Sequence, residues 1–269
     1  MLRKKKIAPD PTVSRSTLKM RLLKKLKCTT RFERELWREG AQLVAGVDEV
    51  GRGALFGPVV AGAVILDPSY RIKGLRDSKL LPAARRVVLA ERIKQHCIAW
   101  AIAAVDVARI DQLNIYHASR LAMTEAVRQL LPAPDFLLID ALKLEHPCQQ
   151  RSIIHGDALS ASIAAASIVA KVERDLMISA WAPVFPAYDL ASNKGYRSPK
   201  HLKALREYGP SPLHRQSFAP VWNAASPQEA LEFILQEESS PEAEALLEEV
   251  ELESAAADDD QVELTSVGS

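Results

Sequence analysis

Short apolar segments that run directly into acidic residues recur along this chain of 269 residues. The segment VAGV is followed at once by Asp48 and Glu49, FLLI by Asp140, and SIIHG by Asp157. Short apolar runs bounded by turn residues are typical of buried strands, so each acid is expected at a strand end. Amphipathic segments of helical period separate these runs. This order predicts an α/β domain in which helices flank a mixed central sheet.

Hydrophobic periodicity locates the expected elements along the chain. Strands are predicted at 42–50, 57–66, 97–107, 136–140 and 152–156. Helices are predicted at 16–27, 31–40, 81–96, 114–131, 160–181 and 198–209. The helix at 160–181 begins with many Ala and Ser residues, and such small side chains let a helix lie close to a sheet.

Charge is strongly segregated, although the formal net charge is only +1. Residues 1–31 carry eleven Lys and Arg against one acid, whereas residues 229–263 carry fourteen acids and no Lys or Arg. We therefore expect a basic N-terminal extension at 1–30, a catalytic domain at 31–225 and an acidic tail at 226–269, with both ends partly disordered. A mildly basic domain with a strongly basic arm suits a polyanionic partner.

The cysteines and the apolar segments also limit the cellular compartments in which this chain is expected. The three cysteines, Cys28, Cys97 and Cys148, form no CxxC pair, which argues against a zinc site or a disulfide framework. No apolar run approaches 18 residues, and the basic start lacks the apolar core of a signal peptide. These features predict a cytoplasmic protein that does not enter a membrane. A mitochondrial presequence, which is also basic and poor in acids, is the alternative.

The four acids are interpreted as a metal-dependent phosphoryl-transfer site. Carboxylates held close together repel one another, and hard divalent cations such as Mg²⁺ favour oxygen ligands. Taken singly, each acid has a simpler explanation. Asp48 and Glu49 could be a surface pair at a strand end, and Asp140 and Asp157 could each cap a helix. Their joint occurrence beside a glycine turn favours the metal site.

That turn, Gly51-Arg52-Gly53, directly follows the first acidic pair. Glycine allows positive φ and lets a backbone approach a sugar or a phosphate closely. Backbone groups of the turn could then contact a 2′-hydroxyl, the group that distinguishes RNA from DNA. The simpler reading is an ordinary surface turn.

Candidate substrate contacts lie at three further places. Ser78 and Lys79 stand in a loop before a helix, where they either start the helix or contact phosphate. Lys171 lies on the helix that follows Asp157 and is either solvated or directed at substrate. Lys194 and Tyr196 open a segment in which basic residues alternate with aromatic ones, a pattern that suits phosphate contact combined with stacking.

Together these motifs resemble ribonuclease HII, the type 2 ribonuclease H family. The matching stretches, in the order of the family over about 44–221, are GVDEVGRGALFGPVVAGAV, DSKLL, LLIDAL, HGDALSASIAAASIVAKVERD and NKGYRSPKHLKALREYGPSPLHRQSFAPV. The GRG triplet separates this family from ribonuclease HIII, which shares DEVG and the downstream acids but lacks GRG. Ribonuclease HIII also carries a folded N-terminal extension for which this chain leaves no room.

The resemblance implies a ribonuclease H-like fold and endonucleolytic cleavage of RNA in RNA–DNA hybrids. It also implies incision of duplex DNA on the 5′ side of an embedded ribonucleotide, as in DNA replication and ribonucleotide excision repair, leaving a 3′-hydroxyl and a 5′-phosphate. Two divalent ions, Mn²⁺ or Mg²⁺, would activate water and stabilise the leaving oxygen. The matching metal-binding acids are Asp48, Glu49, Asp140 and Asp157, and the matching readers of the 2′-hydroxyl are Gly51, Arg52, Gly53 and Tyr196.

Three other classes compete with this interpretation. A non-catalytic nucleic-acid-binding module would not need all four acids, and a nuclease or integrase that cuts DNA would not need a 2′-hydroxyl reader. A carbohydrate hydrolase would need an aromatic platform near Asp48. The partners expected are the RNA–DNA hybrid and ribonucleotide-containing duplex DNA, and the protein is expected to be a monomer. The segments QEALEFIL and QVEL begin like sliding-clamp motifs but lack the aromatic pair, so clamp contact is a minor alternative.

Overall fold

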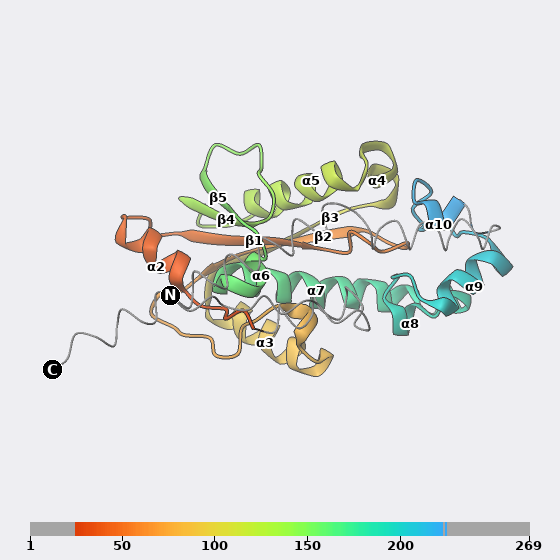
Figure 1. The fold of residues 1–269 in the computed structure, drawn as a ribbon, viewed down its shortest axis with the longest axis horizontal. Helices are drawn as coiled ribbons and strands as arrows, with labels where there is room; N and C mark the ends of the chain where they lie inside the picture. Colours follow the sequence, from red (N-terminus) through yellow and green to blue (C-terminus); the bar gives the residue numbers. More distant parts are fainter. Residues whose placement is uncertain (1–24, 223, 225–269) are drawn as a thin grey trace, which may run out of the picture. The chain divides into compact units, whose positions relative to one another are not determined.

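The computed structural model describes residues 25–222 and 224, which lie almost wholly in a compact unit that spans Lys27–Ala230 (Figure 1). Residues 1–24 of the predicted basic extension, most of the helix predicted at 16–27, the acidic tail and both clamp-like segments lie outside the described residues. No helix in the described part of the chain is both long and apolar enough to cross a membrane.

The unit is built on a five-stranded mixed sheet. Its strands are β1 (Val44–Val50), β2 (Val59–Leu66), β3 (Cys97–Val105), β4 (Phe136–Asp140) and β5 (Gln149–Ile153), in the spatial order β3-β2-β1-β4-β5. The first three strands pair antiparallel, whereas β4 runs parallel to both β1 and β5. The α/β class and the mixed sheet predicted from the sequence are confirmed.

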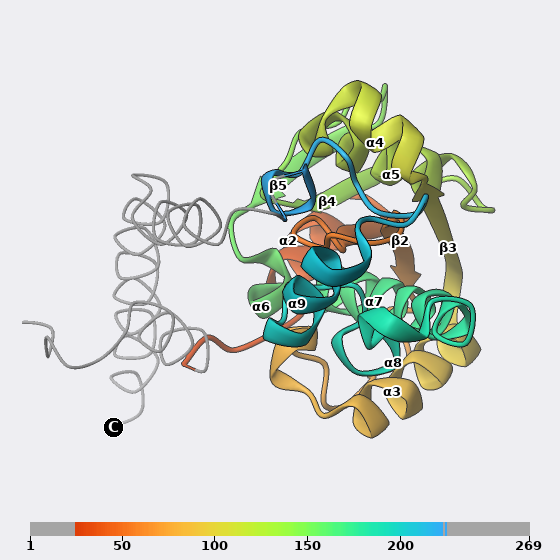
Figure 2. The same cartoon turned by 90° about the vertical axis from the view of Figure 1, so that its right-hand side faces the viewer.

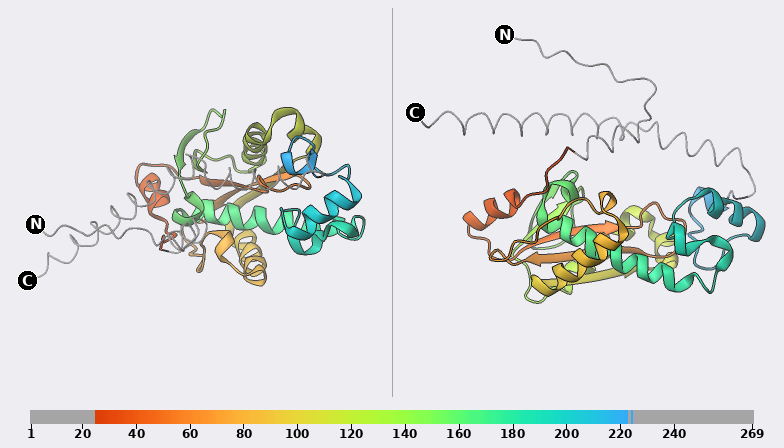
Figure 3. Two further views of the ribbon diagram at one scale, coloured as in Figure 1. Left: turned by 45° about the vertical axis from the view of Figure 1, so that its right-hand side comes forward. Right: turned by 90° about the horizontal axis from the view of Figure 1, so that it is seen from below.

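Helices cover both faces of this sheet. On one face lie α4 (Val107–Leu113) and α5 (Ile115–Arg128), and on the other lie α3 (Ala83–His96), α6 (Gly156–Leu159) and α7 (Ala161–Trp181) (Figures 1 and 2). Each face has its own apolar core, one shared with α5 and the other with α3 and α7. Figure 3 shows α3 lying beside α7 on the same face. This sandwich buries the centre of the sheet on both sides.

Helix α7 lies unusually close to β1 and β2 because two glycines face it. A Cβ atom on Gly46 would stand 2.0 Å from the backbone carbon of Ser162, and one on Gly62 would stand 2.6 Å from the carbonyl oxygen of Ala166. The Ala- and Ser-rich start of the helix matches the prediction that small side chains allow close approach. The close packing holds α7 next to the acidic end of β1.

Smaller elements complete the unit at its two ends. Helix α2 (Arg31–Arg38) lies at one end, and the other end holds η2 (Pro186–Tyr188), α8 (Leu190–Asn193), α9 (Pro199–Tyr208) and α10 (Ala219–Trp222) (Figure 1). The second group packs around Phe56, which is fully buried, in a separate apolar cluster. A single-turn helix, η1 (Ser78–Leu80), precedes α3.

Most predicted elements are found within a few residues of their expected bounds, but the last strand was misplaced and short helices were not predicted. The strand predicted at 152–156 ends at Ile153 and starts earlier, at Gln149, and most of its side chains are not buried because β5 is an edge strand. Helix α4 was missed. The structure shows that Asp106 caps it by accepting a hydrogen bond from the backbone N–H of Arg109, 2.8 Å away. The strand expected to reach residue 107 therefore stops at Val105.

Candidate active site

The sheet topology brings the four predicted acids to one region. Asp48 and Glu49 lie near the end of β1, and Asp140 is the last residue of β4. These two strands run parallel with Val47 opposite Ile139, so the acids that follow are neighbours across the strands. Asp157 differs from expectation. It lies in the first turn of α6, after His155 has turned the chain with a φ of 54°, and not at a strand end.

Burial raises the pKa of every acid in this cluster, and neighbouring negative charges, which for Asp157 come from Asp77, raise it further. Desolvation is the largest cause in each case. It raises the pKa of Asp48 well above its usual range, and the negative charges of Asp140, Glu49 and Asp157 raise it further. The pKa of Asp140 rises to about 7 and that of Asp157 to about 6. The acids therefore lie close enough to disfavour one another's ionised forms.

Hydrogen bonds hold individual carboxylates in place. The backbone N–H of Gly156 donates to Asp140 Oδ1 at 2.7 Å, and the N–H of Glu49 donates to Asp48 Oδ1 at 2.8 Å. Ser167 of α7 hydrogen-bonds Asp48 and moderates its pKa. By contrast, Glu49 Oε2 is buried without a hydrogen-bond partner. An orphaned buried carboxylate oxygen is costly unless a cation or donor reaches it.

Two cations border the cluster. Lys79 Nζ lies 3.8 Å from Asp157 Oδ2, and Arg52 Nη1 lies 3.4 Å from Glu49 Oε1. Desolvation lowers the pKa of Lys79, but the surrounding carboxylates, Asp157 first, raise it above its ordinary value overall. The side chain of Lys79 is 72% exposed, which leaves its ammonium group accessible to a phosphate.

The donor set suits a divalent cation, although no ready-made cage exists. Among residues 25–222 and 224, no three His, Cys, Asp or Glu side chains already stand in ligand geometry around one point. The chemistry nevertheless fits, because four carboxylates have raised pKa values and one carboxylate oxygen has no hydrogen-bond partner, while the ion pairs found to them in the described part of the chain come from Arg52 and Lys79. Hard divalent cations prefer such oxygen ligands.

The Gly-Arg-Gly turn follows the acids directly. Gly51 has a φ of +92°, which favours glycine. Its space is restricted as well, because a Cβ atom there would stand 2.2 Å from Arg174 Nε. Gly53 has open space around its Cβ position, so its backbone is approachable from outside.

Two buried arginines, Arg174 and Arg215, contact this turn from the protein interior. Neither was predicted as a site residue from the sequence. Arg174 of α7 has no exposed surface, and it donates to the carbonyl oxygens of Phe56, Pro58 and Lys194, each 3.0 Å away. Arg215 donates to the carbonyl of Arg52 at 2.8 Å. Burial lowers the pKa of Arg215 to about 9, which leaves it charged at neutral pH.

Tyr196 lies beside the turn. It forms an isolated antiparallel bridge with Ala54, the residue after Gly53. Lys171 Nζ and Arg174 Cζ lie 4.8 Å and 5.1 Å from the centre of its ring, so two cations flank the aromatic face. The structure thus places Tyr196 next to the glycine turn, as their shared proposed role requires.

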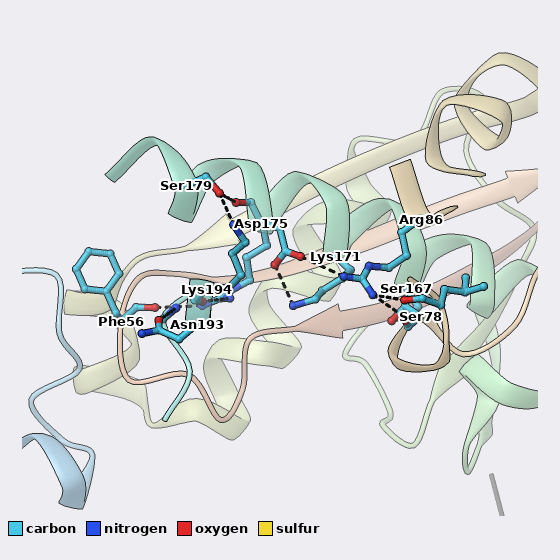
Figure 4. A network of polar contacts seen from close by, with 12 residues as sticks. Phe56, Ser78, Arg86, Ser167, Lys171, Asp175, Ser179, Asn193 and Lys194 are labelled. Carbon is cyan, nitrogen blue, oxygen red and sulfur yellow. Dashed lines mark hydrogen bonds and ion pairs between the residues drawn. The ribbon is translucent and has the colours of Figure 1, made fainter. Parts of the chain in front are cut away.

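The other predicted contacts have clear partners (Figure 4). Lys171 forms an ion pair with Asp175 at 2.9 Å, and only 16% of its side chain is exposed. Lys194 Nζ is held by Ser179 Oγ and by the carbonyl of Ala191, both at 2.7 Å. Lys194 therefore shapes the loop through these bonds and through its own carbonyl, which accepts from Arg174.

Ser78 is buried and turned inward. Its hydroxyl lies 3.0 Å from Ser167 Oγ, so it supports the serine that hydrogen-bonds Asp48. Arg86 fastens the same loop by donating to the carbonyl of Ser78 at 3.1 Å and to that of Leu81 at 2.6 Å (Figure 4). The structure thus places Ser78 behind the acids and leaves Lys79 at the surface.

Comparison with known proteins identifies the family. The family model for Ribonuclease HII matches residues 45–221. This chain belongs to the ribonuclease HII family. A curated relative named ribonuclease HII, from Koribacter versatilis (strain Ellin345), is 72% identical over 225 residues, which cover 84% of this chain and 89% of the relative. The chain is accordingly a nuclease that hydrolyses RNA in RNA–DNA hybrids.

Solved structures agree with this assignment. Ribonuclease H2 from Pyrococcus horikoshii OT3 superposes with a TM-score of 0.60 at 25% identity, covering 68% of this chain and 97% of that one. Bst-RNase HIII, solved in complex with Mn²⁺, gives a TM-score of 0.53 at 18% identity, covering 82% of this chain and 76% of that one. At that lower identity the likeness supports the ribonuclease HII/HIII fold alone.

Proposed function

We propose that this ribonuclease HII also incises duplex DNA on the 5′ side of a single embedded ribonucleotide, leaving a 3′-hydroxyl and a 5′-phosphate. The observation that supports this most directly is the bridge between the backbones of Tyr196 and Ala54, the residue after Gly53. The Tyr196 ring also lies 5.1 Å from the guanidinium of Arg174, the side chain against which Gly51 packs. A turn with an approachable backbone next to a ring can examine one sugar. A nuclease that ignored the 2′-hydroxyl would have no use for this pairing.

Each group of residues has a defined part in this reaction. Asp48, Glu49, Asp140 and Asp157 would hold two divalent ions, Mg²⁺ or Mn²⁺. Bound ions of this kind activate water and stabilise the leaving oxygen of a phosphodiester. The turn and Tyr196 align the ribose, and exposed Lys79 contacts phosphate. Alignment of this kind accelerates the reaction because the scissile bond is held in place before chemistry starts.

A duplex that carries one ribonucleotide provides the decisive test. We expect a single nick immediately 5′ of the ribonucleotide in the presence of Mg²⁺ or Mn²⁺, and we expect no nick in excess EDTA. The matched control is the same duplex with deoxyribose at that position. Equal cutting of both duplexes, or undiminished cutting in EDTA, would contradict the proposal.

Tyr196→Ala should lower kcat at a single ribonucleotide by about tenfold or more, corresponding to about 1.4 kcal/mol of barrier. Duplex binding should weaken much less, because the ring is proposed to align the sugar in the transition state and not to supply ground-state affinity. Steady-state kinetics and a binding titration on the same duplex separate the two effects. Tyr208→Ala, at an exposed tyrosine on α9, is the control. A rise in KM with unchanged kcat would assign Tyr196 to binding alone.

A further inference from the structure

Two buried histidines near the site have no role in the reaction described so far. His201 lies in α9 and His214 in the segment that follows it, and both side chains are fully buried. Their Nε2 atoms are 3.0 Å apart. A contact between two ring nitrogens at this distance requires one proton between them, carried by one ring and accepted by the other.

The neighbouring groups decide which ring carries that proton. The backbone N–H of Ser211, which can only donate, lies 2.9 Å from His214 Nδ1, and the Ser211 hydroxyl, which can donate or accept, lies 2.8 Å from the same nitrogen. His214 Nδ1 is therefore an acceptor, and the ring carries its proton on Nε2 and donates it to His201. His201 then carries its own proton on Nδ1, which lies 2.9 Å from the carbonyl oxygen of Tyr196. Each group in this series donates to the next one, from Ser211 through His214 and His201 to the carbonyl of Tyr196, and we call this series of hydrogen bonds the relay.

At the His214 end, backbone hydrogen bonds join the histidine pair to the segment 55–57, which links the glycine turn to β2. The N–H of Gly57 donates to the carbonyl of Leu213 at 2.9 Å, and the N–H of Arg215 donates to the carbonyl of Leu55 at 2.9 Å. His214 stands between these two bonds and faces Phe56 in an isolated bridge. The relay thus connects the chain that leaves the Gly51–Gly53 turn with the backbone of Tyr196.

The surroundings keep both rings neutral. Desolvation lowers the pKa of His201, and it lowers that of His214 to about 3, with the neighbouring ring as a further cause. Few charged or titratable groups face the pair. The negative charge of Asp189 raises the pKa of His201 slightly against the effect of burial. The centre of the Tyr188 ring lies 4.6 Å from that of His214, and the Tyr188 hydroxyl donates to the carbonyl of Gly209. Only the neutral pair can keep the relay intact, because a second proton would place two donors face to face.

We propose that His201 and His214 are positioning residues for Tyr196. Their hydrogen bonds fix the Tyr196 backbone relative to the Gly51–Gly53 turn, and this position determines how the 2′-hydroxyl is read. This inference rests on the proposed function of Tyr196 and the turn. The hydrogen bonds of the two rings involve none of the four acids. The histidine pair therefore affects only the alignment of the ribose. Its loss should lower cleavage most on a duplex that contains a single ribonucleotide.

Variants at His201 test the relay. His201→Leu removes the donor to Tyr196, and we expect kcat on the single-ribonucleotide duplex to fall at least tenfold with KM changed less than about threefold. Cleavage of a continuous RNA–DNA hybrid should fall less, because every register of that strand offers a 2′-hydroxyl. His201→Asn places an amide N–H near the Nδ1 position and should recover much of the lost kcat. His117→Asn, at an exposed histidine on α5, is the matched control.

A readout without substrate keeps the test decisive even if His201→Leu does not fold. In ¹⁵N-labelled wild-type protein the ring nitrogens should show His214 protonated on Nε2 and His201 protonated on Nδ1. The opposite tautomers would overturn the proposal, as would a His201→Asn variant no better than a folded His201→Leu variant. A wild-type enzyme that cut the hybrid but never the single-ribonucleotide duplex would instead overturn the proposed function. The relay would then be decided by the tautomers and by whether the Tyr196 ring resonances move in His201→Leu.

Discussion

Asp48→Asn and Asp140→Asn should each lower turnover on an RNA–DNA hybrid at least about a hundredfold, corresponding to about 2.7 kcal/mol of barrier. Asparagine keeps the shape of the side chain but removes the negative charge that a divalent cation requires. Single-turnover cleavage at saturating Mg²⁺ or Mn²⁺ measures the loss. A variant that kept more than about a tenth of wild-type activity would show that its residue is not a ligand.

The same substitutions should stabilise the metal-free protein. Both carboxyls have a folded-state pKa above the unfolded value, and that of Asp140 is about 7 against an ordinary 3.8. Above the folded pKa both states are ionised, so the folded state bears the full cost of desolvation and repulsion. As the pH falls from about 7 towards 4, the folded state binds protons that the unfolded chain does not yet bind, and this cost disappears.

The stabilisation by asparagine should therefore be largest at pH 8 and shrink towards pH 4. Its upper bound is a few kcal/mol, since each unit of pKa shift corresponds to about 1.4 kcal/mol. Denaturant unfolding in EDTA at several pH values measures it. Asp67→Asn, at a surface acid whose pKa is lowered by hydrogen bonds from Ser69, is the control and should not stabilise the protein. A gain that was constant with pH would mean that folding does not raise the pKa of these two carboxyls.

The order and type of the main elements were open to prediction because strand and helix periods are local properties. The acids of β1 and β4 came together because those apolar runs pair in parallel, a pairing that the predicted mixed sheet allowed but did not specify. Asp157 was misplaced for a local reason. His155 adopts the left-handed region, which few non-glycine residues favour, so a turn and α6 replace the last residues of the expected strand.

Long-range polar partners could not be predicted in this way. Ser78 was predicted either to start a helix or to contact phosphate. It begins η1, and its hydroxyl lies against Ser167, 89 positions along the chain. Only the position of Arg174 within its helix indicated that this residue is buried. It lies four residues after buried Ala170 and four before buried Ile178, on the inward stripe of α7. A charged residue on such a stripe must find buried partners, but its three carbonyl acceptors come from loops that no periodicity connects to the helix.

Arg174→Met should lower the free energy of unfolding by about 3–5 kcal/mol, because three buried carbonyls would lose their donor and each buried polar group left unsatisfied costs about 1–3 kcal/mol. Methionine fills much of the same space but donates no hydrogen bond. The carbonyls of Phe56, Pro58 and Lys194 would lose their donor inside the protein. Equilibrium unfolding in urea measures the change.

Two matched variants sharpen this prediction. Arg92→Met removes an exposed arginine from α3 and should change stability by less than about 0.5 kcal/mol. Arg174→Lys keeps the charge but cannot place a planar fork among three acceptors, so it should fall between wild type and Arg174→Met. If Arg174→Met unfolded at the same urea concentration as Arg92→Met, the guanidinium beneath Gly51 would not be what holds the turn against the Tyr196 loop. That arrangement would then have to rest on the backbone bonds from Leu55 and Phe56 to the carbonyl of Gly195.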